Sequence, residues 1–338
     1  MNLISVGDMA RAYQLRHQSQ GLKSELTRLS QELTTGQRTD TAAALRGDFS
    51  TLAGIEGSLA VLTSYKGAAA EATLMVETMQ TALGTIQTMT SQAGPSLIAF
   101  STTTTPEAIA AKTADVHQKF MAAIDLMNAN TGGRYVLSGA ATDRKPVADG
   151  AQILDWLRGH VAGQISASDI AAAVDGWFDA PPGGGGFVDL AYGGSAQPLA
   201  GIPIAPGETA DLRVSAADPE MRDTLKGLAL AALVSEGLLP GDHIERARLT
   251  RLAGERIIAA DRSIVGVQAR LGIQEETIAA TQSRNAAETA TLHVTRSALA
   301  EADPYDTATA LEAVRAQIET LYTLTARNAR LSLTNYLK

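Results

Sequence analysis

The amino-acid sequence predicts a mainly α-helical protein. Both chain ends are expected to form a long antiparallel helical coiled-coil rod, with a small α+β, β-rich domain inserted in the middle. First, the run from Arg248 to Glu301 contains no proline and is rich in residues that favour helix. Second, apolar residues recur at intervals of three and four near both ends, which places them on one helix face. Third, glycine, proline and acidic residues gather between Gly150 and Glu220, which indicates a region of another kind.

The overall composition limits the possible functions. Aromatic residues make up only 4% of the 338 residues, which suits thin helical bundles packed by Ala, Leu, Val and Ile. The net charge of −8 argues against nucleic acid as a partner, because a phosphate-binding surface needs clustered Lys and Arg. The chain has no cysteine, which excludes disulfides and thiol chemistry. No apolar run approaches the roughly 20 residues of a membrane span, so we expect no membrane partner.

The first expected helix carries a narrow leucine stripe and ends near Gly36, because glycine readily adopts the left-handed conformation at a helix C-terminus. Residues 34–48 form a polar connector, and the pattern resumes from Leu52 to Ile86. One such stretch alone also fits an ordinary amphipathic core helix. Near-heptad stretches at both ends favour paired helices. The N-terminal stripe consists of Leu22, Leu26, Leu29 and Leu33.

The middle of the chain is expected to be more varied. A break is expected at Gly94-Pro95, and a new helix should begin with Thr105 as N-cap and Pro106 in its first turn. That helix should end at residues 131–133. Residues 138–220 should form a separate outer domain, with one helix (152–174) and short strands near residues 187–191, 199–204 and 210–215. Residues 150–220 hold nine acidic and two basic side chains, so we expect an acidic, solvated surface.

The C-terminal part contains three expected helix starts. Asp218-Pro219-Glu220 begins one helix that ends at Gly237, and Asp242 caps the long helix that follows. The long helix should be interrupted at Asp303-Pro304, with Asp303 capping the next one, because proline removes a helical donor. A second apolar stripe then follows at Leu311, Val314, Ile318 and Leu321.

The sequence offers no clear catalytic or metal-binding pattern. Its five histidines are scattered, and Gly183–Gly186 lacks the Lys-Ser/Thr of a phosphate loop. No serine lies in a G-x-S-x-G elbow. We therefore expect no cofactor, no metal and no enzymatic activity. An enzyme housed in the 138–220 region is kept as an alternative.

Three stretches resemble the flagellin family. Residues 29–38 (LSQELTTGQR) resemble the Leu-x-x-Gly-x-Arg turn that ends its N-terminal helix. Residues 265–271 (VGVQARL) are similar to a Val-Gly-Ala-x-x-Asn-Arg-Leu segment, and residues 301–306 (EADPYD) resemble an acidic hinge. The matching residues are Gly36, Arg38, Gly266, Arg270, Asp303 and Tyr305.

Two further stretches resemble the hook-associated junction proteins within that family. Residues 133–139 (GRYVLSG) with 142–146 (TDRKP) are similar to a Gly-x-Tyr-Leu-Phe-Ser-Gly segment followed by Thr-x-x-x-Pro. Residues 331–337 (LSLTNYL) resemble a Ser-Leu-x-x-Tyr-Leu ending. Ala269 and Pro304 depart from the filament flagellin pattern, which separates the chain from filament flagellin more than from a junction protein. The matching residues of this branch are Tyr135, Ser138, Gly139, Tyr336 and Leu337.

The resemblance implies a structural adaptor of the bacterial flagellum that joins a hook-side hook-associated protein to the flagellin filament by head-to-tail self-assembly. Residues 1–35 and 304–338 would form a terminal coiled coil, disordered in the free monomer. Residues 36–137 and 221–303 would form a helical rod domain, and 138–220 the outer domain. The self-assembly interface would comprise Leu22, Leu26, Leu29, Leu33, Leu311, Val314, Ile318 and Leu321.

The expected partners are further copies of the chain, the neighbouring hook-associated protein, flagellin and the flagellar export apparatus, with an export chaperone as a further candidate. Family members are exported without a cleaved signal peptide, and the first 16 residues lack the features of one, so an extracellular location is expected. One alternative is filament flagellin itself. An alternative of another class is a cytoplasmic coiled-coil signalling or adaptor module.

Overall fold

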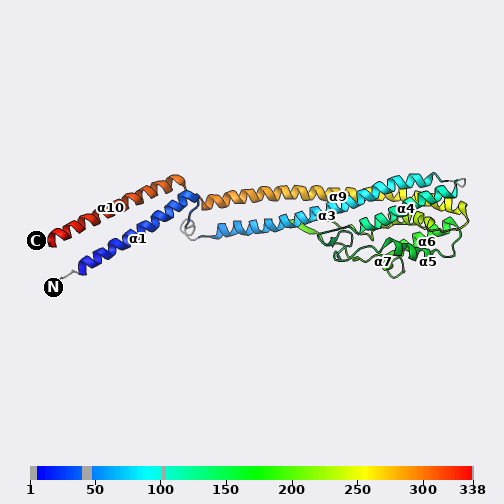
Figure 1. The fold of residues 1–338 in the computed structure, drawn as a ribbon, viewed down its shortest axis with the longest axis horizontal. Helices are drawn as coiled ribbons and strands as arrows, with labels where there is room; N and C mark the ends of the chain where they lie inside the picture. The colour runs from blue at the N-terminus through cyan, green and yellow to red at the C-terminus, as the bar shows by residue number, and fades with distance from the viewer. Residues whose placement is uncertain (1–5, 40–47, 101–103, 337–338) are drawn as a thin grey trace. The chain divides into compact units, whose positions relative to one another are not determined.

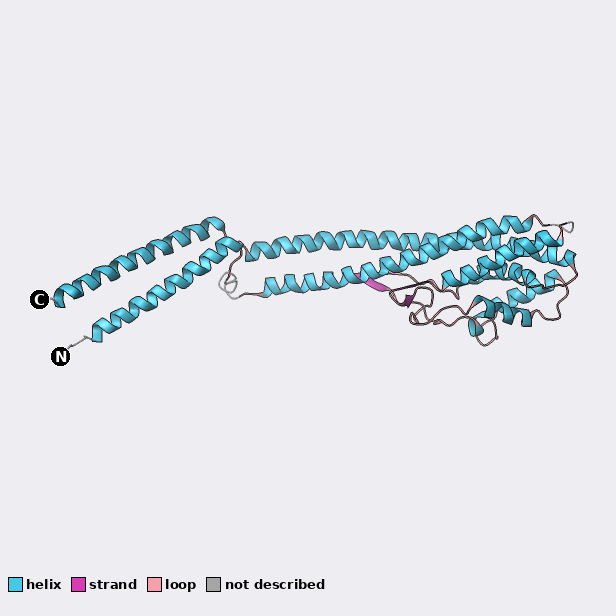
Figure 2. Ribbon diagram, viewed as in Figure 1, coloured by secondary structure: helices cyan, strands magenta, loops and turns pink. Residues whose placement is uncertain are grey.

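The computed structural model describes residues 6–39, 48–100 and 104–336. These residues are mainly helical, and the strands among them form two short two-stranded sheets (Figures 1 and 2). The chain divides into two compact units, one made of Met1–Val61 with Ala287–Lys338 and the other of Leu62–Ala286. Both divisions fall inside the two longest helices, α3 (Ser50–Ile98) and α9 (His243–Ala300). The predicted helical fold class is therefore confirmed at this coarse level.

The first unit contains helices α1 (Val6–Thr35) and α10 (Pro304–Tyr336), which lie side by side and run in opposite directions (Figure 1). Helix α1 ends where expected, because Gly36 has a φ of 68° and its N–H donates to the carbonyl of Glu32 at 2.8 Å. The predicted interruption before Pro304 is also confirmed. Asp303 caps α10 by accepting hydrogen bonds from the backbone N–H groups of Tyr305 (2.8 Å) and Asp306 (3.2 Å).

The second unit is built on four helices, α3, α4 (Pro106–Met127), α8 (Pro219–Ser235) and α9. Helix α8 packs against α4, and every residue from Thr224 to Val234 is buried. A helix that is buried all round lies at the centre of a bundle. Helices α3 and α9 are joined by polar contacts, among them a hydrogen bond from Gln80 Nε2 to the carbonyl of Gln268 at 3.0 Å.

Glycines bring these helices close together. A Cβ on Gly94 in α3 would lie 2.6 Å from a side-chain carbon of Ile258, and one on Gly254 in α9 would lie 2.9 Å from the carbonyl oxygen of Gly94. The expected break at Gly94-Pro95 is wrong, because α3 continues through both residues to Ile98. Gly94 serves helix packing here, and Pro95 is exposed and lies in the last turn of the helix.

The predicted helix starts in the second unit are confirmed. Thr105 Oγ1 accepts from the N–H of Ala108 at 3.3 Å, with Pro106 as the first helical residue. Helix α8 begins at Pro219 after Asp218. Asp242 Oδ1 accepts from the N–H of Glu245 at 3.0 Å at the start of α9. The predicted end of α4 at residues 131–133 is wrong. The helix ends at Met127, and residues 130–135 form a short hairpin of β1 (Asn130–Thr131) and β2 (Arg134–Tyr135).

The expectation that residues 138–220 are β-rich is wrong. They contain helices α5 (Gly150–His160), α6 (Ala167–Asp179) and α7 (Phe187–Leu190) and one hairpin of β3 (Ile202–Ala205) and β4 (Glu208–Ala210).

The errors within this region have local causes. The single helix expected over 152–174 is two helices, because Gly163 adopts a φ of 85° and Ser166 caps α6. The strand expected at 187–191 is helix α7. The strand at 199–204 overlaps β3, and most of the strand at 210–215 lies outside β4. Short apolar runs fit strand and helix equally well, so their pattern could not decide.

Residues 138–220 also share a core with the helices around them. The rings of Trp177 and Phe178 meet edge-on at 5.0 Å, and Phe187 stacks on Phe178 at 5.3 Å. These three side chains belong to the same buried apolar cluster as Phe120 of α4 and Leu228 of α8. The region is therefore packed into the second unit and does not form a separate outer domain in this structure.

Many acidic side chains of this region are paired with cations, although most of those paired remain exposed, as the expected solvated surface requires. Lys226 Nζ lies 2.6 Å from Oδ2 of Asp179, and the Lys226 side chain is only 9% exposed. Asp175 is held by Arg256 of α9, with Nε 3.0 Å from Oδ1. Further pairs join Asp155 to Arg158, Glu208 to Arg284, Asp211 to Arg213 and Glu220 to Arg270. Three of these carboxylates, Asp175, Asp179 and Glu208, thus attach the region to α8 and α9.

Candidate assembly interface

The contact between α1 and α10 brings most of the predicted interface residues together. Leu29, Leu311 and Val314 form a buried apolar cluster, with 5%, 7% and 8% of their surfaces exposed. Four half-buried side chains pack against this cluster, namely those of Leu22, Leu26, Ala310 and Ile318. We call these seven residues the seam. Six of them are among the eight positions expected from the sequence.

The two remaining positions behave differently. Leu321 is buried, with 7% of its surface exposed, and lines a separate hollow with Leu15 and Tyr322. Leu33 is 41% exposed and does not belong to the seam. The structure therefore groups six of the predicted residues, leaves Leu321 nearby on α10, and leaves Leu33 uncovered.

The seam uses only part of the apolar surface of these two helices. Tyr13 on α1 is 70% exposed and Tyr305 on α10 is 80% exposed. Other exposed apolar side chains on the same helices are Met9, Tyr322 and Leu324. Two helices can cover only one face of each other, so a third element is needed to bury the others.

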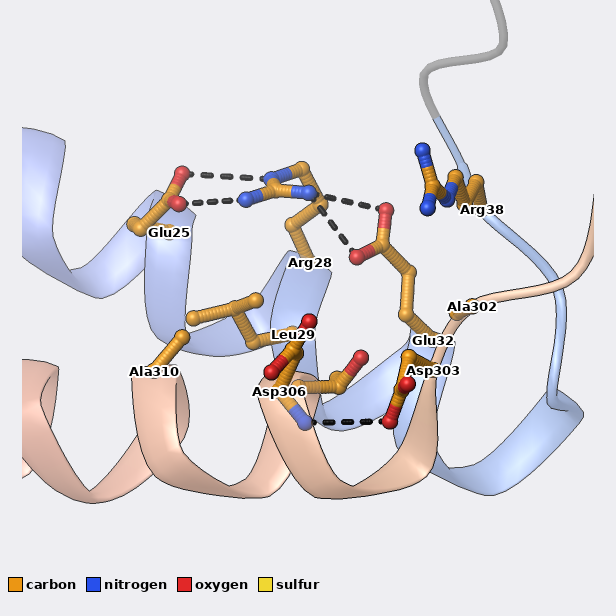
Figure 3. Close-up of a pocket in the computed structure, with 10 residues that line it drawn as sticks. Glu25, Arg28, Leu29, Glu32, Arg38, Ala302, Asp303, Asp306 and Ala310 are labelled. Atoms are coloured by element: carbon orange, nitrogen blue, oxygen red, sulfur yellow. Dashed lines mark hydrogen bonds and ion pairs between the residues drawn. The ribbon is translucent and has the colours of Figure 1, made fainter. Parts of the chain in front are cut away.

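A charged network lies where α1 ends and α10 begins (Figure 3). Arg28 lies between two carboxylates of its own helix, with NH1 2.8 and 2.9 Å from the oxygens of Glu32 and Nε 3.2 Å from Glu25. The Glu32 side chain is 5% exposed, and its Oε1 also accepts from the N–H of Thr39 at 2.8 Å. The hydrogen bond from Arg28 lowers the pKa of Glu25, although partial burial opposes it. These residues line a hollow of about 550 Å³.

At the same place, backbone hydrogen bonds join the residues just after α1 to the residues just before α10. Gln37 and Glu301 form an antiparallel bridge. It is flanked by hydrogen bonds from Arg38 N to Ala300 O at 2.9 Å and from Ala302 N to Gly36 O at 3.0 Å. Arg38 Nε donates to the carbonyl of Glu301 at 3.0 Å. Three of the predicted motif residues, Gly36, Arg38 and Asp303, therefore meet at one joint.

Most of the other motif residues lie in the second unit, whereas Tyr305 and Tyr336 lie on α10 in the first. Ser138 is buried and its Oγ donates to the carbonyl of Tyr135 at 3.0 Å. Gly139 has a φ of 60° and passes so close to Gln197 and Ser195 that a Cβ would lie 2.7 Å from both carbonyl oxygens.

On α9, Gly266 has open space around it, and Arg270 NH2 lies 3.2 Å from Glu220 of α8. Tyr336 is the last residue of α10, and Leu337 lies outside the described residues. Contacts within the second unit are therefore made by Tyr135, Ser138, Gly139 and Arg270, and none of these four residues is part of the seam.

Sequence reasoning missed the charged network of Glu25, Arg28 and Glu32. The signal was present, because acidic and basic residues three and four apart face one another on a helix. What the spacing could not show is that Glu32 also binds the backbone of Thr39 beyond the helix end.

No group of three or more His, Asp or Glu side chains in the described parts of the chain is placed to hold a metal ion. Within those same ranges, no helix is long and apolar enough to cross a membrane. No protein-family model matches the chain, and no curated protein sequence is significantly similar to it. The arrangement offers apolar packing between α1 and α10 and ion pairs within α1, and apolar packing of helices is a means of protein–protein association.

Proposed function

We propose that this chain is a non-enzymatic structural adaptor of the bacterial flagellum, which joins a hook-side hook-associated protein to the flagellin filament by head-to-tail self-assembly. The observation that carries the proposal is the seam between α1 and α10, together with the apolar side chains that the two helices leave exposed. In this proposal residues 1–35 and 304–338 form the terminal coiled coil, and helices α3 and α9 continue it as a rod.

The physical argument starts from the thinness of the seam. Only Leu29, Leu311 and Val314 are buried in it, and isolated helix pairs draw most of their stability from such packing. Neighbouring copies would supply the apolar surface that one pair lacks. Contacts between different patches of identical chains are heterologous, and they generate rings or helical tubes. This is the geometry that an adaptor between two tubular assemblies requires.

The flagellar assignment rests on the resemblance of the motifs. Gly36, Arg38 and Asp303 occupy one joint, as expected for residues that shape the end of the terminal helices. Tyr135 and Ser138 carry the resemblance to the junction branch. The partners would be further copies of the chain, the adjacent hook-associated protein, flagellin and the export apparatus with its chaperone. The location would be extracellular, reached without a cleaved signal peptide.

Deletion of the gene tests the role directly. We expect cells that carry hooks without filaments and that release flagellin into the medium, as seen by electron microscopy and by assay of the medium. If the chain were filament flagellin itself, flagellin would be missing from the medium as well. Intact filaments would contradict both flagellar roles and favour a cytoplasmic coiled-coil module.

Point substitutions in the seam test the interface. Leu26→Asp and Ile318→Asp should each abolish incorporation into the flagellum and leave the chain soluble, because a carboxylate on an apolar contact loses its water. Matched controls are Ser30→Asp on α1 and Gln317→Asp on α10, since both positions are exposed. Incorporation is measured by the amount of the chain in purified flagella. Normal incorporation of either seam variant would refute the proposed interface.

A further inference from the structure

The seam alone does not define which helices pair. Its large apolar residues recur at intervals of three and four on both α1 and α10. Such stripes can pair in parallel or antiparallel directions, in several registers, and within or between chains. A separate feature is needed to select the antiparallel pair that the structure shows.

We propose that residues 32–39 and 300–306 form a register clasp, which fixes the direction and alignment of α1 on α10 within one chain. The clasp contains three kinds of contact that do not involve the seam. They are the backbone bridge at Gln37 and Glu301, the bond from the Glu32 carboxylate to the N–H of Thr39, and the bond from Arg38 Nε to the carbonyl of Glu301. The inference does not depend on the flagellar role.

The local geometry shows how the clasp sets the alignment. Helix α1 ends one residue before the left-handed Gly36, and α10 begins one residue after its cap Asp303. The end of α1 and the start of α10 are therefore joined by a bridge that pairs Gln37 with Glu301. No slip of α10 along α1 is possible while the bridge is closed, because a one-residue shift breaks both backbone hydrogen bonds.

The burial of side chains along α1 agrees with an alignment that is set at the clasp. Glu32 and Leu29 are 4% and 5% exposed, whereas Leu26 and Leu22, farther from the clasp, are only half buried. The Glu32 carboxylate is held on one side by Arg28 and on the other by Thr39. The tightest contacts of α1 thus lie next to the clasp and weaken away from it.

The cysteine-free chain allows the clasp to be measured with an engineered pair. Gln37 and Glu301 are exposed, and the hydrogen bonds on either side make them a non-hydrogen-bonded antiparallel pair. Cα atoms in such pairs are about 4.5 Å apart, which suits a disulfide. The double variant Gln37→Cys/Glu301→Cys is prepared as the full-length chain, dilute, in a glutathione redox buffer. The quantity measured is the effective concentration of the two thiols.

We expect an intramolecular disulfide and no linked dimers. Adding Gly36→Ala should lower the effective concentration about 5- to 30-fold, because a left-handed conformation costs an alanine about 1–2 kcal/mol. Apart from its chain neighbours, nothing lies within 4 Å of the new Cβ, so the effect isolates the backbone. The control Gly21→Ala makes the same change within α1, also in open space, and should not lower it. Equal values for the Gly36→Ala and Gly21→Ala chains, or a predominance of linked dimers, would overturn the proposal.

A second measurement tests whether the clasp governs the helices. Trypsin cleavage after Lys23 in α1 and after Arg315 in α10 requires local opening of each helix. We expect oxidation of the engineered pair to slow both cleavages at least about tenfold relative to the reduced chain. Equal rates would show that the bridge does not control the pairing. Fluorescence of Trp156 and Trp177, which both lie in the other unit, verifies in every sample that the second unit is folded.

Discussion

At the scale of single residues, Asn128 shows how one side chain can make the two backbone hydrogen bonds that a neighbouring strand would make. It caps the C-terminal end of α4, its Nδ2 donates to the carbonyl of Val147 at 3.0 Å, and its Oδ1 accepts from the Val147 N–H at 2.9 Å. Val147 is fully buried, so no water can replace these bonds. This role could not be predicted from the sequence, because an amide that binds backbone nineteen residues away leaves no periodic pattern.

We expect Asn128→Ala to lower the free energy of unfolding of the second unit by about 2–4 kcal/mol, because it leaves a buried donor and a buried acceptor unpaired. Urea unfolding followed by tryptophan fluorescence measures the change. The exposed neighbour provides a control, since Asn130→Ala should alter stability by less than about 0.5 kcal/mol. Equal effects of the two substitutions would refute the role of Asn128.

Asp218 makes a pH-dependent contribution to folding stability, and its sign is opposite to that of a carboxyl whose pKa is lowered on folding. Burial raises the pKa of its carboxyl, and Glu220 adds to this, while the N–H of Ser215 donating at 2.9 Å opposes it. A carboxyl with a raised pKa in the folded state contributes stability below its ordinary value of about 3.9. It loses that contribution as pH rises through the folded-state pKa.

Asp218→Asn should therefore raise the free energy of unfolding at pH 7, by less than about 1 kcal/mol because the group is partly exposed. The amide oxygen can still accept from Ser215. The gain over the natural chain should shrink as pH falls towards 4, and urea unfolding at several pH values measures it. A loss of stability at pH 7 would show that the carboxylate is favoured by the start of α8 more than burial disfavours it.

At the scale of elements, the glycines of the second unit set the spacing of three helices. A Cβ on Gly227 of α8 would lie 2.9 Å from the backbone nitrogen of Ile257, and one on Gly254 would meet α3 at a similar distance. Atoms of the backbone cannot move aside without shifting a helix. These glycines are therefore required for packing, although glycine lowers helix propensity.

Gly254→Ala should destabilise the second unit by about 1–3 kcal/mol, because it overpacks the crossing of α9 and α3. Gly266→Ala on the same helix meets nothing within 4 Å and should stabilise it by up to about 1 kcal/mol through helix propensity. The midpoints of urea unfolding by tryptophan fluorescence compare the two. Stabilisation by both substitutions would mean that α3 and α9 can move apart at their crossing without loss of folding free energy.

The elements also show what could be predicted from the sequence. Helix ends at Gly36, Thr105, Asp242 and Asp303 were correct, because capping depends on side chains within a few residues. The elements of 138–220 were not, because short apolar runs carry no period long enough to identify them. The ion pairs that hold α6, such as Asp175 with Arg256, join residues far apart in the chain, and composition alone suggested a solvated acidic surface.

At the scale of the whole molecule, the two compact units differ in what holds them together. The second unit has an extensive buried core, whereas the core of the first is the seam. Six seam residues followed from the heptad-like spacing, but the clasp did not, because its contacts are largely backbone. The expectation that the chain ends are disordered in the free monomer stays a prediction, and the effective concentration of the engineered thiols decides it.

We expect the two units to unfold separately. Ile318→Asp should lower the temperature at which part of the helical circular dichroism is lost, and should leave the transition seen by tryptophan fluorescence unchanged, because both tryptophans lie in Leu62–Ala286. Thermal unfolding followed by the two signals checks this. A shift of the fluorescence transition by more than about 2 °C would show that the units are coupled.

The contacts that close the second unit have a consequence for the order in which the chain is made. Gln282 of α9 donates to Thr73 of α3 at 3.1 Å, across 209 residues of sequence, and Lys226 and Arg256 reach back to α6. A growing chain that stops before α9 has Lys226 of α8 but lacks Arg256 and the helix surface that α3 and α6 need. During most of its synthesis this unit has no complete core to fold around, so its folding must wait until nearly the last fifty residues remain to be added.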